Sequence, residues 1–338
     1  MAGRRTSKAG EVEALSLVDE TQANRVTVEA FELITRKMRI GRVPVIFKAL
    51  AAEKALLPCW QALRPAVRLR AFEEAADELR VKAAAAAVDL GCPLIGTQLE
   101  WAGYDLDQID EIRGQVDIFH YQDAKLLMAA ATMLKALEGG VGGAKPTPRG
   151  TQLVPRGVPQ HMDPIELVSE DATGTLAKSF KAIRSHLGLG VLTDDFRALG
   201  RWPKYLEIAW EDARKRDREP RAKEAVAELG ASADHLAELL PVRVVVSDAT
   251  LVAAGADPAR VRALLSRFRR ALPSLVLDLA LFKVQLDGAE DARESPFPIR
   301  WKYIATDDYM DLDVDADVKL RAGDPTSLDD VDEQPARR

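Results

Sequence analysis

The sequence has few of the residues that build disulfide frameworks, metal centres or membrane spans. Only two cysteines, Cys59 and Cys92, occur among 338 residues, and they do not form a CxxC pair. Because no apolar segment near Met1 resembles an export signal, we expect reduced thiols in a cytoplasmic protein. The four histidines show no pairing at ligand spacing, so we expect no metal site. No apolar run approaches the ~20 residues of a membrane span, so we expect no membrane partner.

Net charge is also small over most of the chain. The sequence carries 47 basic and 53 acidic residues, a net charge of −6. Residues 306–338 alone hold eleven acids and four bases, so the rest of the chain is close to neutral. A near-neutral body lacks the basic surface of nucleic-acid proteins, and we expect no nucleic-acid partner. We interpret residues 306–338 as an acidic tail and the polar residues 1–24 as a disordered N-terminus.

Helical periodicity, by contrast, is present almost throughout. Apolar residues recur three or four apart over residues 26–40, 66–90 and 109–137. The only good strand candidate is Val242–Val246, which is followed by Ser247, a residue suited to capping a helix. The pattern predicts an all-α protein.

One segment interrupts the helical pattern. Residues 139–160 contain six glycines and four prolines, so no helix persists there. We interpret this segment as a linker between two helical halves, residues 25–138 and 161–305.

The two halves share short strings at nearly one offset. Residues 47–50 match residues 196–199, and residues 74–79 match residues 224–229, at offsets of 149 and 150. Several matches in the same order indicate duplication. We therefore predict two tandem helical repeats that pack as a pseudo-dimer.

The matched positions differ in one informative place. At the offset of 149, Asp194 corresponds to Val45 and Asp195 to Ile46. If these positions line a shared cleft, carboxylates face an apolar wall, and burial would raise their basicity as a general base requires. The alternative interpretation is that the two acids only stabilise the start of a helix capped by Thr193.

The same region carries a family resemblance. Residues 192–206, LTDDFRALGRWPKYL, resemble the signature of the group I 2-haloacid dehalogenases, and residues 119–127, 155–159 and 272–282 are further family-like stretches. The resemblance implies an all-helical, duplicated, cofactor-independent hydrolase of short 2-haloalkanoic acids. Its repeat is similar to that of AhpD-type peroxidases, whose CxxC pair is absent here. In this family an aspartate activates water, which displaces halide with inversion and without a covalent intermediate.

The resemblance also implies candidate site residues. It assigns the water-activating role to Asp195, with Asp194 as the alternative base. Asp194 stands where the family usually has a small hydroxyl residue, and we expect it at the substrate-binding site. A further group is expected to line the substrate pocket: Pro44, Ile46, Phe47, His120 and Tyr121. For His120 and Tyr121 a hydrogen-bonded core pair is the alternative.

Two other functions stay open at this point. A protein of this fold that lost its chemistry would serve as a helical-repeat binding or scaffold protein, and Asp194 favours that interpretation. A hydrolase of the same fold could also act on another small acid. A homodimer is a further expectation.

Overall fold

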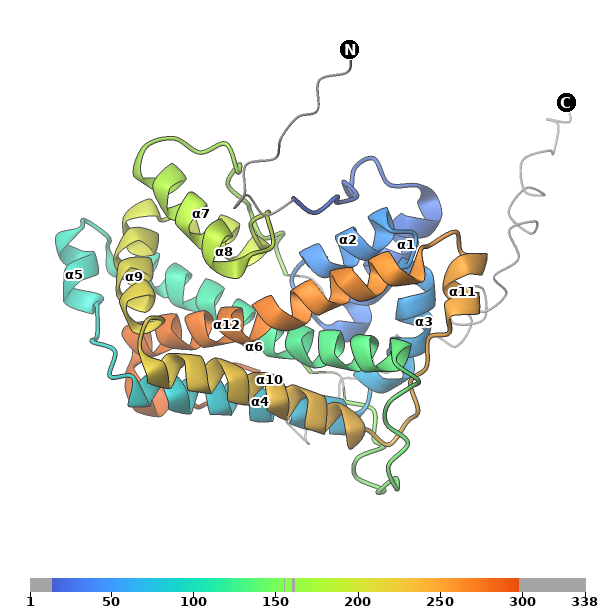
Figure 1. The fold of residues 1–338 in the computed structure, drawn as a ribbon. Helices are drawn as coiled ribbons and strands as arrows, with labels where there is room; N and C mark the ends of the chain where they lie inside the picture. The colour runs from blue at the N-terminus through green and yellow to red at the C-terminus, as the bar shows by residue number, and fades with distance from the viewer. Residues whose placement is uncertain (1–13, 155, 160–161, 298–338) are drawn as a thin grey trace, which may run out of the picture. The chain divides into compact units, whose positions relative to one another are not determined.

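A computed structural model describes residues 14–154, 156–159 and 162–297. Residues 1–13 of the expected disordered N-terminus and the whole acidic tail, 306–338, lie outside the described residues. Within the described ranges the chain forms twelve helices and no strand, so the all-α prediction is confirmed (Figure 1).

The helices fall into two sets of six, and helices at the same place in the two sets have similar lengths. The set before the linker is α1 (Arg25–Met38), α2 (Val45–Ala52), α3 (Leu56–Val67), α4 (Arg70–Asp89), α5 (Gly96–Trp101) and α6 (Leu106–Leu137). The set after it is α7 (Gly174–Leu187), α8 (Asp194–Leu199), α9 (Pro203–Arg216), α10 (Pro220–Glu238), α11 (Asp248–Ala253) and α12 (Pro258–Asp291). In each set the last helix is the longest, with 32 residues in α6 and 34 in α12, which is interrupted at Gly288.

Local sequence explains where the two longest helices begin. The Asp105 carboxylate accepts from the Gln108 backbone N–H while the Gln108 side chain accepts from the Asp105 N–H, a capping box that starts α6. The Asp257 carboxylate caps α12 by accepting from the Ala259 and Arg260 N–H groups, and Pro258 occupies the first helical position, where a missing N–H has no cost. Each cap stabilises its helix by about 1 kcal/mol.

Equivalent helices of the two sets pack against each other. α6 lies against α12, α4 lies against α10, and the crossed pairs α6–α8 and α12–α2 are also in contact (Figure 1). Lys82 of α4 donates a hydrogen bond to Ser232 of α10 at 2.9 Å, which joins positions 150 residues apart. A two-fold axis brings each element against its own copy in this way. This packing supports the proposal that the two sets are duplicated repeats.

The predicted strand at residues 242–246 does not form. Val244 makes only an isolated bridge with Val141, because no further strand lies beside it in the described residues. Ser247 does cap a helix, and its hydroxyl accepts from the Thr250 N–H at the start of α11.

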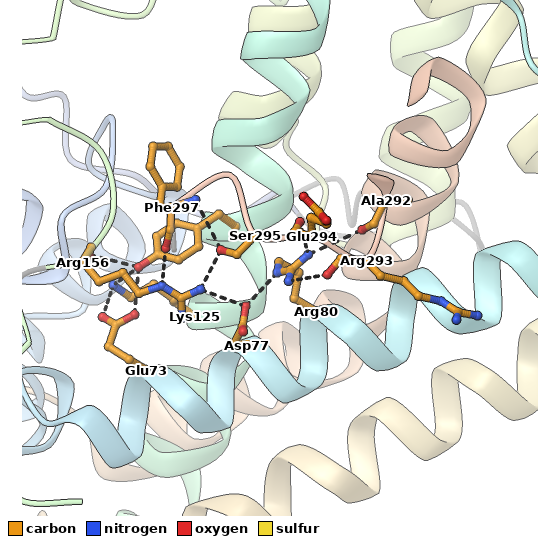
Figure 2. A network of polar contacts seen from close by, with 11 residues as sticks. Glu73, Asp77, Arg80, Lys125, Arg156, Ala292, Arg293, Glu294, Ser295 and Phe297 are labelled. Atoms are coloured by element: carbon orange, nitrogen blue, oxygen red, sulfur yellow. Dashed lines mark hydrogen bonds and ion pairs between the residues drawn. The ribbon is translucent and has the colours of Figure 1, made fainter. Parts of the chain in front are cut away.

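The linker is held to the helical body by a buried polar network (Figure 2). Lys125 of α6 lies 2.6 Å from Glu73 of α4, and both side chains are buried. Tyr121 donates to the Glu73 carboxylate and also lies 3.0 Å from the carbonyl of Arg156 in the linker. The Arg156 guanidinium in turn reaches Asp77 at 3.1 Å. Since buried charges are costly unless paired, this network fixes where the linker runs.

None of the described helices is both long and apolar enough to cross a membrane.

Candidate active site

A small cavity lies where α2, α6, α8 and α12 meet. Its volume is about 20 Å³, enough for about one water molecule, so a larger guest requires the side chains around it to shift. The lining residues come from both halves of the chain: Pro44, Val45, Ile46, Gln122, Asp123, Leu126, Thr193, Asp194, Asp195, Phe268, Leu272 and Leu275.

Asp195 is the second residue of α8 and lines this cavity from the helix start. Its side chain is buried, and its Oδ2 atom has no hydrogen-bond partner among the described residues. Burial raises the pKa of Asp195 to about 7, a rise that the Thr193 hydroxyl and the Phe196 N–H limit and the charge of Asp194 increases. A carboxylate with a pKa near neutrality suits a general base.

Asp194, the neighbouring acid, has a different environment. Its Oδ2 atom lies 3.3 Å from the Lys48 ammonium and 3.9 Å from the Arg42 guanidinium. Its Oδ1 atom lies 3.9 Å from Arg197. Glu20 also pairs with Lys48, at 2.7 Å. Asp194 is therefore compensated by cations, whereas Asp195 has no ion-pair partner among the described residues.

Asp123 of α6 is a third buried acid at the cavity, and the sequence interpretation missed it. Its Oδ2 atom also lacks a hydrogen-bond partner among the described residues. Burial raises the pKa of Asp123 well above its ordinary value, and the charges of Asp195 and Asp194 add to this. Burial therefore favours the protonated form of Asp123, the form that can donate a hydrogen bond. The available signal was an acid within the family-like stretch of residues 119–127.

We call Asp123, Asp194 and Asp195, on α6 and α8, the acidic wall of the cavity. The apolar wall comprises the cavity-lining side chains of α2 and α12, which are Val45, Ile46, Phe268, Leu272 and Leu275.

The apolar wall also offers backbone donors. α2 begins after Pro44, which provides no side-chain cap. The backbone N–H groups of Val45 and Ile46 have no acceptor among the described residues. Free N–H groups at a helix start favour an anion.

The structure brings together only some of the residues expected at the pocket. Asp195, Asp194, Pro44 and Ile46 line the cavity. Three expected residues do not: Phe47, His120 and Tyr121.

Each of the three has a different environment. Phe47 is buried against the Trp60 ring, with centroids 6.1 Å apart. Tyr121 points into the linker network, because residues two apart on a helix face nearly opposite directions and Asp123 takes the cavity side. His120 is buried, neither ring nitrogen has a hydrogen-bond partner in the described part of the chain, and burial lowers its pKa well below the ordinary value.

A second cluster of ionisable side chains lies outside the cavity lining. His186 of α7 lies between two carboxylates, 3.2 Å from Asp278 of α12 and 3.7 Å from Asp217, which follows α9. Burial lowers the pKa of His186, but the two carboxylates more than offset this and raise it to about 9. These three residues are the only described group of His, Cys, Asp and Glu ligand atoms close enough to hold a metal ion.

Comparison with known proteins gives consistent matches. The family model described as halocarboxylic acid dehydrogenase DehI matches residues 41–196, a span that includes α2, α6 and both acids of α8. An (R)-2-haloacid dehalogenase of Pseudomonas putida is 28% identical over 79% of this chain and 91% of its own length. A configuration-inverting 2-haloacid dehalogenase of Alcaligenes xylosoxydans xylosoxydans is 28% identical over 80% of this chain and 93% of its own length.

Solved structures match over a similar span. A D-2-halacid dehalogenase mutant superposes with a TM-score of 0.76 at 25% identity, covering 80% of this chain and 96% of that one. A complex of D-2-haloacid dehalogenase with L-LA has a TM-score of 0.75 at 27% identity over the same shares.

Proposed function

We propose, from the premise that this chain belongs to the group I 2-haloacid dehalogenase family, that it hydrolyses short 2-haloalkanoic acids to 2-hydroxyacids with inversion. One observation supports this proposal most. Asp195 is a buried carboxylate without an ion-pair partner in the described residues, it faces an apolar wall, and its pKa is raised to about 7.

In the proposed reaction a water molecule beside Asp195 attacks the carbon that bears the halogen. The new C–O bond forms as the C–halogen bond breaks, and the halide leaves with the bonding electrons from the opposite face. The Asp195 carboxylate takes the proton of the attacking water. The products are the inverted 2-hydroxyacid, a halide ion and one proton, and no ester with the protein is formed. Alignment of water and substrate contributes several kcal/mol to such a step.

Asp123 orients the water in this account. Burial raises the pKa of Asp123 and so favours its protonated form, which can donate a hydrogen bond to the water. A donor beside the base holds the water oxygen while Asp195 accepts one of the water's hydrogens. In this proposal the two acids have different roles, with Asp123 as a hydrogen-bond donor and Asp195 as the proton acceptor.

The substrate carboxylate requires positive partners away from the base. The N–H groups of Val45 and Ile46 at the start of α2, which have no acceptor among the described residues, provide them. The alkyl group and halogen then contact Phe268 and Leu272 of the apolar wall. The small cavity favours substrates with short alkyl chains.

The direct test supplies both enantiomers of 2-chloropropionate and measures chloride release and the configuration of the lactate formed. We expect turnover with inversion for at least one enantiomer. In water labelled with oxygen-18, a single turnover should place the label in lactate and none in the protein. Label in Asp195, or lactate with retained configuration, would contradict direct attack by water.

If no short 2-haloacid releases halide, the two alternatives take over. Hydrolysis of another small acid would keep Asp195 as a base, whereas a scaffold protein would retain neither activity. Asp194 favours these alternatives only weakly, because Lys48 and Arg42 compensate its charge.

A cytoplasmic location and a homodimer complete the proposal. Both cysteines are free, and Cys59 is buried, which is compatible with a reducing compartment. Sedimentation analysis of the full chain decides the oligomeric state.

A further inference from the structure

The strongest unexplained feature outside the cavity is the cluster of His186, Asp217 and Asp278. The three side chains converge from α7, from the residue after α9, and from α12, three helices that pack against one another. One ligand atom from each residue lies within 4.8 Å of the other two. In the described part of the chain, no Lys or Arg pairs with either carboxylate.

The potential ligand atoms are also the ones left without hydrogen bonds. Asp278 is fully buried, and neither of its oxygens has a hydrogen-bond partner among the described residues. The same is true of His186 Nε2 and of one Asp217 oxygen. His186 Nε2 lies 3.2 Å from Asp278 without the alignment of a hydrogen bond. Buried polar atoms normally have partners, so four unpartnered atoms within one cluster of three side chains require an explanation.

The spacing fits a bound divalent cation. Nitrogen and oxygen ligands of tetrahedral Zn²⁺ lie about 2.0–2.2 Å from the ion and thus about 3.3 Å from one another. The 3.2 Å between His186 Nε2 and Asp278 agrees with this value. Asp217 lies 3.7 Å from the other ring nitrogen, Nδ1, so its side chain must turn toward Nε2 to share the ion. His186 and Asp217 remain 22% and 15% exposed, which leaves an entry path from solvent.

The surroundings hold the imidazole in place. The Trp210 ring packs edge-on against His186 with centroids 5.3 Å apart. In the first set of helices, Lys37 stands at the place of His186 and Leu126 at the place of Asp278. Neither of these residues offers the imidazole or carboxylate ligand that the second set has. The cluster therefore belongs to the second half of the chain alone.

We propose that His186, Asp217 and Asp278 bind one first-row divalent cation, such as Zn²⁺ or Mn²⁺, as a structural ion that ties α7 and α9 to α12. A mixed set of one imidazole and two carboxylates suits these ions. The two carboxylates and a neutral imidazole balance the charge of the ion. The ion is not part of the proposed hydrolysis, because none of its ligands lines the cavity. The histidine spacing gives no hint of it, since the ligands come from three separate helices.

The test uses the full chain, without an affinity tag and stripped with a chelator. Zn²⁺ and Mn²⁺ are titrated by calorimetry, and Co²⁺ is titrated by its visible absorption, which reports ligand number. We expect one ion per chain at the cluster and a higher Tm with the ion bound. His186→Gln and Asp217→Asn should each weaken binding by at least about tenfold, and each avoids removing the fully buried Asp278.

The matched control is His235→Gln, the same substitution at an exposed histidine of α10. It should leave binding unchanged, which separates the cluster from weak binding to the acidic tail that every variant retains. Equal affinity in the wild type, His186→Gln and Asp217→Asn would overturn the proposal. So would a failure of all three ions to bind below about 1 mM, which would leave a protonated His186 paired with two carboxylates. Neither result bears on halide release, so the proposed function is tested separately.

Discussion

The two walls of the cavity occupy equivalent places in the two halves of the chain, yet their chemistry is opposite. Asp194 and Asp195 are the first two residues of α8, as Val45 and Ile46 are of α2. Asp123 is the eighteenth residue of α6, as Leu275 is of α12. Each acid of the acidic wall therefore has an aliphatic counterpart in the apolar wall.

If the two halves arose by duplication, this difference explains how the site acquired a direction. Two identical walls would present either two groups of repelling acids or none. Acids at a few positions place the proposed base on one side of the cavity and apolar side chains on the other, while equivalent helices pack against each other. The apolar wall also raises the basicity of the acid it faces, because it excludes water.

The largest expected effect comes from removing the base from the acidic wall. Asp195→Asn keeps the shape of the side chain but cannot accept a proton, so kcat for halide release should fall by about 10² or more. Asp194→Asn is the matched control and should retain activity to within about tenfold, since its charge serves ion pairs. A silent Asp195→Asn together with an inactive Asp194→Asn would assign the base to Asp194.

A pair of substitutions at Asp123 sharpens the comparison. Asp123→Leu introduces the counterpart residue from the apolar wall and removes the hydrogen-bond donor, so kcat should fall by roughly tenfold or more. Asp123→Asn preserves a neutral donor and should stay within about threefold of the wild type. Equal loss in both variants would indicate that Asp123 works as a carboxylate, contrary to its raised pKa.

Lys48 tests why two adjacent acids are tolerated. Lys48→Met leaves Asp194 with weaker compensation beside Asp195, and the added negative charge should lower kcat/KM near pH 7 by about tenfold. Adding Asp194→Asn to this variant should restore most of the loss. Without rescue, Lys48 contacts the substrate directly, and KM rather than the pH profile would change.

A smaller effect concerns stability. The folded-state pKa of Asp195 is about 7, above the 3.8 of an exposed aspartate. The unfolded chain therefore releases this proton first, and the free energy of unfolding falls as pH rises from about 4 to 7, by at most about 4 kcal/mol.

Asp195→Asn removes this decline, so urea unfolding should show the variant gaining stability over the wild type at pH 8 but not at pH 4. Exposed Asp171→Asn should show no such dependence. An equal gain in stability at pH 4 and pH 8 would mean that the Asp195 carboxylate is not desolvated.

Sequence patterns predicted the helical fold and the position of Asp195, because both depend on local periodicity and on the comparison of matched positions. They could not show that Asp123 rather than Tyr121 lines the cavity, since only packing decides which face of α6 meets the cavity and which meets the linker. Val242–Val246 has strand composition, but a strand forms only where another pairs with it. The cluster around His186 depends on contacts between distant helices, which spacing along the chain does not reveal.

The pH dependence of kcat/KM for halide release tests the central claim most directly, because it reports the protonation of the base in the free enzyme. With Asp195 as a desolvated base of pKa about 7, the rate should fall tenfold per pH unit below that value and level off above it. Asp194→Asn should move the midpoint to lower pH by removing the adjacent charge. A rate that is constant from about pH 5 to 9, or a midpoint near that of an exposed carboxylate, would contradict the account.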